Sequence, residues 1–239
     1  MLCKSHILPE FLYRNLYNKQ NKFMGITGQG TKGWGLLQKG IREKLFCYDC
    51  EQHLNESYEK PFMQQWTIDF PLPDRMDQDS AHSATYDYNS FKLFHLSILF
   101  RSSVSSLSTF REVNLGMHEE RIRKMIISQD PGKEWEYPIL AFAVLNGRGE
   151  VERRVISCPI SGRHEGHIAY GQIYGGAMWW LLVSSHRNDL FCRHGLQPSG
   201  RITMIAEPWN EIRIVQNAST ALRRSYPKSA KLIGSDENN

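Results

Sequence analysis

The sequence contains no long apolar run and no export signal. Its longest purely apolar stretch, Ala177 to Val183, is far shorter than the roughly 20 residues that a membrane-spanning helix requires. The first residues lack the basic, apolar and small-residue regions of a signal peptide. We therefore expect a cytoplasmic protein that has no membrane partner.

The chain also lacks a strong excess of one charge and an even set of cysteines. Its 29 basic residues stand against 25 acidic ones, which gives a formal charge of +4 and a pI near 8.8. This mild excess permits contact with phosphates but does not identify a nucleic-acid-binding protein. The five cysteines are expected as thiols or metal ligands rather than as a disulfide framework.

Several short motifs of nucleotide-binding and hydrolytic proteins are absent. The chain has no P-loop, no G-x-G-x-x-G and no G-x-S-x-G, which argues against the classes that carry them. What it has is 41% hydrophobic content over 239 residues. That is enough for the core of one large domain or of two small ones.

Composition along the chain predicts an α+β protein in two parts. Residues 1–63 carry a cysteine-bearing segment. Residues 64–87 hold Pro71, Pro73 and several aspartates without a sustained period, which is typical of a linker. Residues 88–226 are expected to form an α+β domain, and the polar residues 227–239 a disordered tail.

The second part begins with helices and continues with strands. FKLFHLSILF at 91–100 is apolar on all sides of a helical wheel, so this helix is expected at the centre of the fold. HEERIRKMIIS at 118–128 predicts a second helix, and residues 217–224 a last one. Between these helices, strands of an antiparallel sheet are predicted from the runs YPILAFAVL, EVERRVISC, HIAYGQIY, AMWWLLVS and RITMIAE.

Two close pairs of metal-ligand residues lie in the first part. Cys3 and His6 form a C-x-x-H pair, and Cys47 and Cys50 form a C-x-x-C pair directly before a helix-like segment, EQHLNESYEK. Four such ligands are what tetrahedral zinc requires. We predict a zinc-binding finger with a treble-clef knuckle; the alternative is a set of unrelated thiols.

These residues resemble the HNH, or ββα-metal, endonucleases, whose pattern runs from a D-H-I-x-P strand to an L-C-x-x-C-H knuckle. The matching segments are SHILP at 5–9 and LFCYDCE at 45–51. A closer likeness is to bacterial proteins without an established activity that carry S-H-I-I-P-E-F-L-Y and G-L-R-E-K-L-x-C-x-x-C-E. The resemblance implies an N-terminal ββα finger, a structural Zn²⁺, and Mg²⁺ or another divalent cation for cleaving nucleic acid.

The roles that the resemblance implies transfer only in part. His6 matches the family's general base, which deprotonates water. Ser5 stands where the family has Asp, and Arg42 or Glu43 stands near its Asn. Glu51 stands where a metal-binding His is common, so Glu51 or Glu43 would have to supply the carboxylate for a hard cation.

The amino end departs from the family as well. HNH proteins that bind zinc present a full cysteine pair before the His, whereas two residues precede Cys3 here. Three interpretations stay open: His6 is the fourth zinc ligand and not a free base, the site is incomplete, or the gene begins upstream.

Two functions are consistent with these features. The first is an HNH-type endonuclease in which His6, with Glu51 or Glu43, is catalytic. The second is a non-catalytic zinc-binding module that binds nucleic acid or a partner protein, and the missing Asp, Asn and His favour it.

Overall fold

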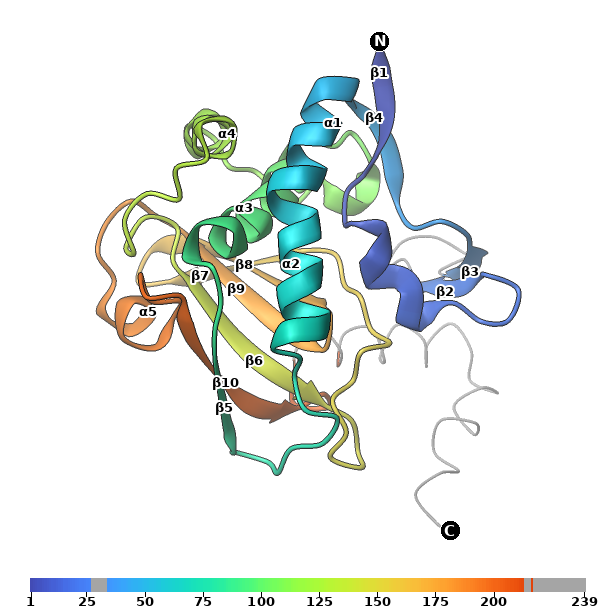
Figure 1. The fold of residues 1–239 in the computed structure, drawn as a ribbon, viewed down its shortest axis with the longest axis vertical. Helices are drawn as coiled ribbons and strands as arrows, with labels where there is room; N and C mark the ends of the chain where they lie inside the picture. The colour runs from blue at the N-terminus through green and yellow to red at the C-terminus, as the bar shows by residue number, and fades with distance from the viewer. Residues whose placement is uncertain (27–33, 213–215, 217–239) are drawn as a thin grey trace.

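The computed structural model describes residues 1–26, 34–212 and 216, and it confirms a mixed α+β fold (Figure 1). The predicted helix at 217–224 and the predicted tail at 227–239 lie outside the described residues. In chain order the elements are β1 (Leu2–His6), η1 (Glu10–Leu16), β2 (Phe23–Ile26), β3 (Trp34–Leu37), β4 (Arg42–Cys47), α1 (Tyr48–Leu54), η2 (Asn55–Glu59), α2 (Lys60–Gln64), η3 (Gln65–Asp69), β5 (Ala81–Thr85), α3 (Tyr88–Val104), η4 (Ser108–Phe110), α4 (His118–Ser128), β6 (Ile139–Leu145), β7 (Ile160–His164), β8 (His167–Tyr174), β9 (Ala177–Val183), α5 (Asp189–His194) and β10 (Arg201–Pro208).

The main sheet has six strands in the order β5-β10-β6-β9-β8-β7. Its neighbours pair antiparallel except for β10 and β6, which are parallel. The prediction of an antiparallel sheet is therefore wrong at this pair. A parallel neighbour needs a crossover connection, and here the chain between β6 and β10 passes through three further strands and α5.

Helix α3 lies between the sheet and the helical segment α1–η3 (Figure 1). On one side Phe94 stacks on Phe62 of α2, with ring centroids 3.7 Å apart. On the other, His95 contacts Trp179 of β9, with centroids 4.1 Å apart. Because both faces are covered, a helix that is apolar on all sides can be fully buried. The predicted central helix is confirmed.

The segment 64–87, predicted as a linker, is instead part of the folded body. The helix continues through η3, and β5 pairs with β10 at the edge of the sheet. Leu54, Tyr58, Phe62 and Trp66 are all buried, and their spacing of four residues places them on one helical face. The Trp66 indole also donates a hydrogen bond to the Gly175 carbonyl at 3.0 Å.

The two predicted parts share one core. Ile7 and Leu8 from the N-terminal segment belong to the same hydrophobic cluster as Phe94 and Trp179. The predicted strand EVERRVISC is not formed: it contributes only the isolated bridge of Val151 to Leu145 and one of Arg75 to Glu150. No helix among the described residues is long and apolar enough to cross a membrane.

Candidate functional site

The N-terminal unit consists of two antiparallel strands followed by a helix. β1 pairs with β4, and α1 begins directly after β4. The ladder holds Leu2 opposite Cys47 at one end and His6 opposite Arg42 at the other. Between the two strands the chain forms η1 and the hairpin of β2 and β3. The strand, strand, helix order agrees with a ββα unit.

His6 is held by the turn that precedes β4. Lys39 and Gly40 both have positive φ, at 63° and 61°, and a side chain at Gly40 would lie 2.7 Å from the Tyr13 ring. This turn places the Lys39 carbonyl 3.1 Å from His6 Nε2. A Glu10 oxygen lies 2.7 Å from the same nitrogen. A proton on Nε2 suits both acceptors and leaves Nδ1 free to accept.

Glu10 is positioned in turn by Tyr17, whose hydroxyl donates to its carboxylate at 2.5 Å. Burial and this hydrogen bond raise the pKa of Tyr17 to about 12, so the hydroxyl stays protonated at neutral pH. The Tyr17, Glu10 and His6 side chains therefore form a chain of contacts at the end of β1. Such a chain can orient an imidazole that acts as a base or as a hydrogen-bond donor.

The backbone carbonyl of His6 is bonded to a buried guanidinium. Arg101 of α3 donates to the His6 carbonyl at 2.9 Å and to the Glu59 carboxylate at 2.6 Å. Its side chain is 1% exposed. A permanent cation therefore occupies the His6 carbonyl and the Glu59 carboxylate, whereas the Glu10 carboxylate contacts the His6 ring.

The C-x-x-C pair lies at the junction of β4 and α1, with the two sulfur atoms 3.4 Å apart. Backbone and side-chain hydrogen bonds from Cys50 lower the pKa of the Cys47 thiol. The hydrogen bond to Cys47 and burial raise the pKa of Cys50.

The other predicted zinc ligands do not lie with this pair. His6 is at the far end of the ladder, roughly 16 Å from Cys47 at a strand rise of about 3.3 Å per residue. Cys3 is opposite Phe46, and successive strand residues face opposite sides, so Cys3 and Cys47 point apart. Among the described residues, no group of three or more His, Cys, Asp or Glu side chains could hold a metal ion.

The set Cys3, His6, Cys47 and Cys50 therefore does not fit one tetrahedral zinc ion, whose ligand atoms lie less than about 5 Å from one another. The carboxylates predicted for a hard cation do not join His6 either. Glu43 accepts hydrogen bonds from Ser105 at 2.7 Å and from the Ser106 backbone at 3.1 Å. Although burial acts in the opposite direction, these bonds lower the pKa of Glu43.

Glu51, the third predicted catalytic residue, lies on α1. Its Oε1 is buried without a hydrogen-bond partner in the described part of the chain. His53, two residues further on, contacts the Ile126 carbonyl through Nε2 at 3.0 Å and so fastens α1 to α4. Neither side chain is in a cluster with His6.

One feature of the β1–β4 ladder was not predicted from the sequence. The register places Lys4 opposite Lys44 and His6 opposite Arg42, and alternate strand residues share a face. We call these four residues the basic face. Lys4 and Lys44 are exposed, and the structure gives Lys4, Arg42 and Lys44 no ion pair within the residues it describes. The sequence shows the basic residues but not the register that aligns them.

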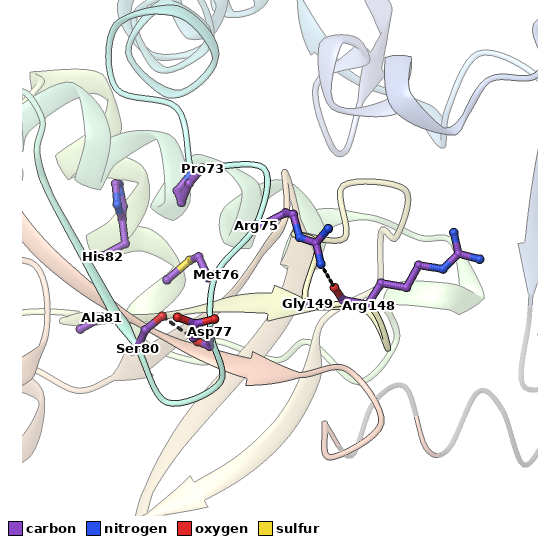
Figure 2. Close-up of a pocket in the computed structure, with 9 residues that line it drawn as sticks. All are labelled: Pro73, Arg75, Met76, Asp77, Ser80, Ala81, His82, Arg148 and Gly149. Atoms are coloured by element: carbon purple, nitrogen blue, oxygen red, sulfur yellow. Dashed lines mark hydrogen bonds between the residues drawn. The ribbon is translucent and has the colours of Figure 1, made fainter. Parts of the chain in front are cut away.

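A cavity of about 380 Å³ lies between residues 73–82 and the turn at Arg148 and Gly149 (Figure 2). Arg75 donates to the Arg148 carbonyl at 2.8 Å. Figure 2 shows the Arg148 side chain directed away from the other lining residues, while Asp77 and His82 lie on the opposite side. Its charged groups do not converge on one point, so the cavity does not define a ligand.

Comparison of the chain with family models, curated proteins and solved structures gives no match. The HNH resemblance therefore stays a prediction that depends on the quoted motifs.

Proposed function

We propose that this protein binds nucleic acid through the basic face of β1 and β4 and does not cleave it. The observation that carries the proposal is the cross-strand pairing of Lys4 with Lys44, beside Arg42 on the same face. Like charges directly opposite each other destabilise an antiparallel pair. A polyanion that runs along the basic face would remove this repulsion.

Phosphate binding is the chemistry that suits such a face. Lys and Arg side chains that neutralise phosphates release condensed counterions, which supplies sequence-independent affinity. The strands β1 and β4 are short, so we expect a few phosphate contacts and modest affinity. The net charge of +4 is small, so the binding depends on the local arrangement rather than on the whole molecule.

The bonds of Arg101 and of Glu43 support the absence of cleavage. Its guanidinium bonds the His6 carbonyl and Glu59, and Glu43 is bonded to the loop after α3. The one carboxylate described against the His6 ring is Glu10, which is engaged by Tyr17 and by His6 itself. Among the described residues, no cluster of His, Cys, Asp or Glu side chains at His6 could hold a metal ion.

Fluorescence anisotropy with labelled single-stranded and duplex oligonucleotides tests the proposal. The double variant Lys4→Gln/Lys44→Gln should bind at least about tenfold more weakly than wild type, or about 1.4 kcal/mol. The matched control is Arg193→Gln/Arg201→Gln, which removes two exposed charges that are not on the basic face. Equal losses in both variants, or no binding by wild type, would contradict the proposal.

Phosphodiester hydrolysis is a second candidate, and the position of His6 favours it. With Nε2 held by the Lys39 carbonyl and Glu10, Nδ1 can accept a proton from water. Incubation of a labelled nucleic acid with Mg²⁺, Mn²⁺ or Zn²⁺ tests this candidate. Cleavage that is lost in His6→Ala and retained in His194→Ala, an exposed histidine, would establish it and overturn the non-catalytic proposal.

A further inference from the structure

A second cavity, of about 290 Å³, lies on another part of the molecule and is lined by three histidines. His118 comes from the first residue of α4, His167 from the first residue of β8, and His186 from the segment after β9. Arg121 and Ser184 also line it. Strands β1 and β4, which carry the basic face, contribute no residue to this cavity.

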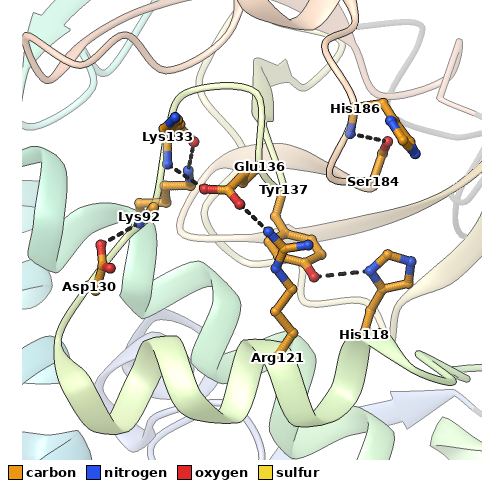
Figure 3. A network of polar contacts seen from close by, with 10 residues as sticks. Lys92, His118, Arg121, Asp130, Lys133, Glu136, Tyr137, Ser184 and His186 are labelled. Atoms are coloured by element: carbon orange, nitrogen blue, oxygen red, sulfur yellow. Dashed lines mark hydrogen bonds and ion pairs between the residues drawn. The ribbon is translucent and has the colours of Figure 1, made fainter.

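Hydrogen bonds fix two of the basic side chains in this cavity (Figure 3). His118 Nδ1 lies 3.0 Å from the Tyr137 hydroxyl, which leaves Nε2 for a ligand. Arg121 forms an ion pair with Glu136 and keeps further N–H donors, because a guanidinium carries five. The Ser184 hydroxyl accepts from the His186 backbone at 3.0 Å.

The charged and titratable groups around His118 are mostly basic. Burial lowers the pKa of His118, and Arg121, His167 and His186 lower it further. The rings of His167 and His186 lie 5.9 Å apart. From the other elements, Tyr137 contributes a neutral hydroxyl. The carboxylates nearby, Glu136 and Glu134, are paired with Arg121 and with Arg187 respectively.

The geometry points to a binding site for the phosphate group of a small molecule or of a nucleic-acid end. Several N–H donors from three elements converge on one cavity, and a phosphate offers acceptor oxygens in several directions. The volume is at the lower limit of typical ligand pockets, which span roughly 300–1,000 Å³. In the described residues these histidines do not form a group that could hold a metal ion.

The start of α4 adds to the attraction for an anion. α4 has 11 residues, begins with His118 and has no side-chain cap. Its first two N–H groups, of His118 and Glu119, are bonded to the Leu115 and Gly116 carbonyls, so the helix dipole alone favours negative charge here. The two acidic residues of its first turn are engaged elsewhere: Glu119 accepts from Ser103 at 2.9 Å, and Glu120 pairs with Arg123 at 2.6 Å.

Phosphate affinity at this site depends on pH in a defined direction. A bound anion favours the cationic form of an imidazole, whereas burial and the neighbouring basic groups lower the pKa of His118, so a lower pH favours binding. We expect inorganic phosphate to bind at least about tenfold more tightly at pH 6 than at pH 8, one pKa unit being a factor of ten. Phosphate itself is more negative at pH 8, so weaker binding there reports on the histidines.

Histidine-ring NMR of the full chain, titrated with inorganic phosphate at both pH values, measures this. The ring signals of His118, His167 and His186 should shift together with one dissociation constant. In His118→Gln/His186→Gln the phosphate affinity should fall at least about tenfold, or 1.4 kcal/mol. His194→Gln, an exposed histidine at the end of α5, should bind as wild type does.

Two further probes identify the source of the phosphate. Adenosine 5′-monophosphate tests a small phosphate monoester, and matched oligonucleotides with a 5′-phosphate or a 5′-hydroxyl test a nucleic-acid end. Tighter binding of either phosphorylated probe than of inorganic phosphate supports the site and names its source. The absence of coupled ring shifts with all these probes at pH 6 overturns it, as does coupled shifting with Zn²⁺ alone. The double variant of the basic face leaves this readout unchanged.

Discussion

Among single residues, Lys92 is a buried ionisable group with 1% of its surface exposed. Its side chain is on the buried helix α3, and the amine donates to the Tyr88 hydroxyl at 3.1 Å and to the Lys133 carbonyl at 2.8 Å. Burial lowers the pKa of Lys92 to about 8, although Glu136 and Asp130 act in the opposite direction. A charged amine in this position therefore costs stability at neutral pH.

The pH dependence that follows has a definite sign. Between pH 8 and the ordinary value of 10.5, the unfolded chain binds a proton at Lys92 that the folded chain has lost. The free energy of unfolding therefore rises with pH in this window. The Lys92 contribution should rise by about 1 kcal/mol between pH 8 and pH 9.5, below the limit of about 1.4 kcal/mol per pH unit. Urea unfolding measures it as the difference between wild type and Lys92→Met, because the buried Cys158 thiol, whose pKa is raised to about 12, lowers stability with pH in the same window.

The variant Lys92→Met should lack this rise, because it has no amine to titrate. The comparison is confined to pH values below 10, since tyrosines with raised pKa values, such as Tyr137 and Tyr170, affect stability at higher pH. A variant that gains as much stability with pH as wild type would show that Lys92 is not the cause.

Residue identity alone predicted some of the site and missed the rest. The spacing of Cys47 and Cys50 correctly indicated two neighbouring thiols, because residues three apart at the start of a helix lie on the same side. Cys3 and His6 were grouped with them by residue type, but the strand register separates them. The three histidines around His118 come from distant segments, and no local motif joins them.

At the scale of elements, the helical segment α1–η3 is attached to α3 by one buried ion pair. The side chains of Arg101 and Glu59 are 1% and 19% exposed. Removing one partner of a buried pair leaves an uncompensated charge. Glu56, on the same segment, pairs with Lys60, and these side chains are 55% and 56% exposed.

This difference predicts unequal costs for two similar substitutions. Glu59→Gln should lower the free energy of unfolding by about 3 kcal/mol, whereas Glu56→Gln should lower it by less than about 0.5 kcal/mol. Chemical denaturation of both variants at pH 7 provides the measurement. Similar costs for the two would mean that Arg101 is not held by Glu59 in solution.

Elements with a strong apolar period were predictable, and polar edge strands were not. α4 has its predicted range because its apolar residues follow the helical period. α3 contains the predicted run 91–100, which was recognised by its length and by being apolar on all sides. β5 (AHSAT) and β7 (ISGRH) lie at the two edges of the sheet, where one side of the strand needs no apolar partner. The run EVERRVISC has the composition of a strand, but its backbone takes part only in two isolated bridges, and the Arg153 side chain donates to the Leu72 carbonyl at 2.6 Å.

At the scale of the whole molecule, the N-terminal unit and the sheet are joined in one core. Ile7 and Phe62 belong to the same cluster as Trp179, so the two predicted parts are not independent. The basic face and the histidine cavity are separate surfaces on this body. A nucleic acid that reached both would be held by its backbone on the hairpin and by a terminal phosphate in the cavity.

If the basic face of β1 and β4 binds the phosphate backbone, the affinity should fall with salt in proportion to the number of phosphate contacts. The slope of log K against log salt is about −0.9 per phosphate contact for duplex DNA and about −0.7 for single strands. The account predicts that Lys4→Gln/Lys44→Gln has a slope shallower by about 1.4–1.8 than wild type, and that Arg193→Gln/Arg201→Gln keeps the wild-type slope. An unchanged slope in Lys4→Gln/Lys44→Gln would contradict binding through the basic face.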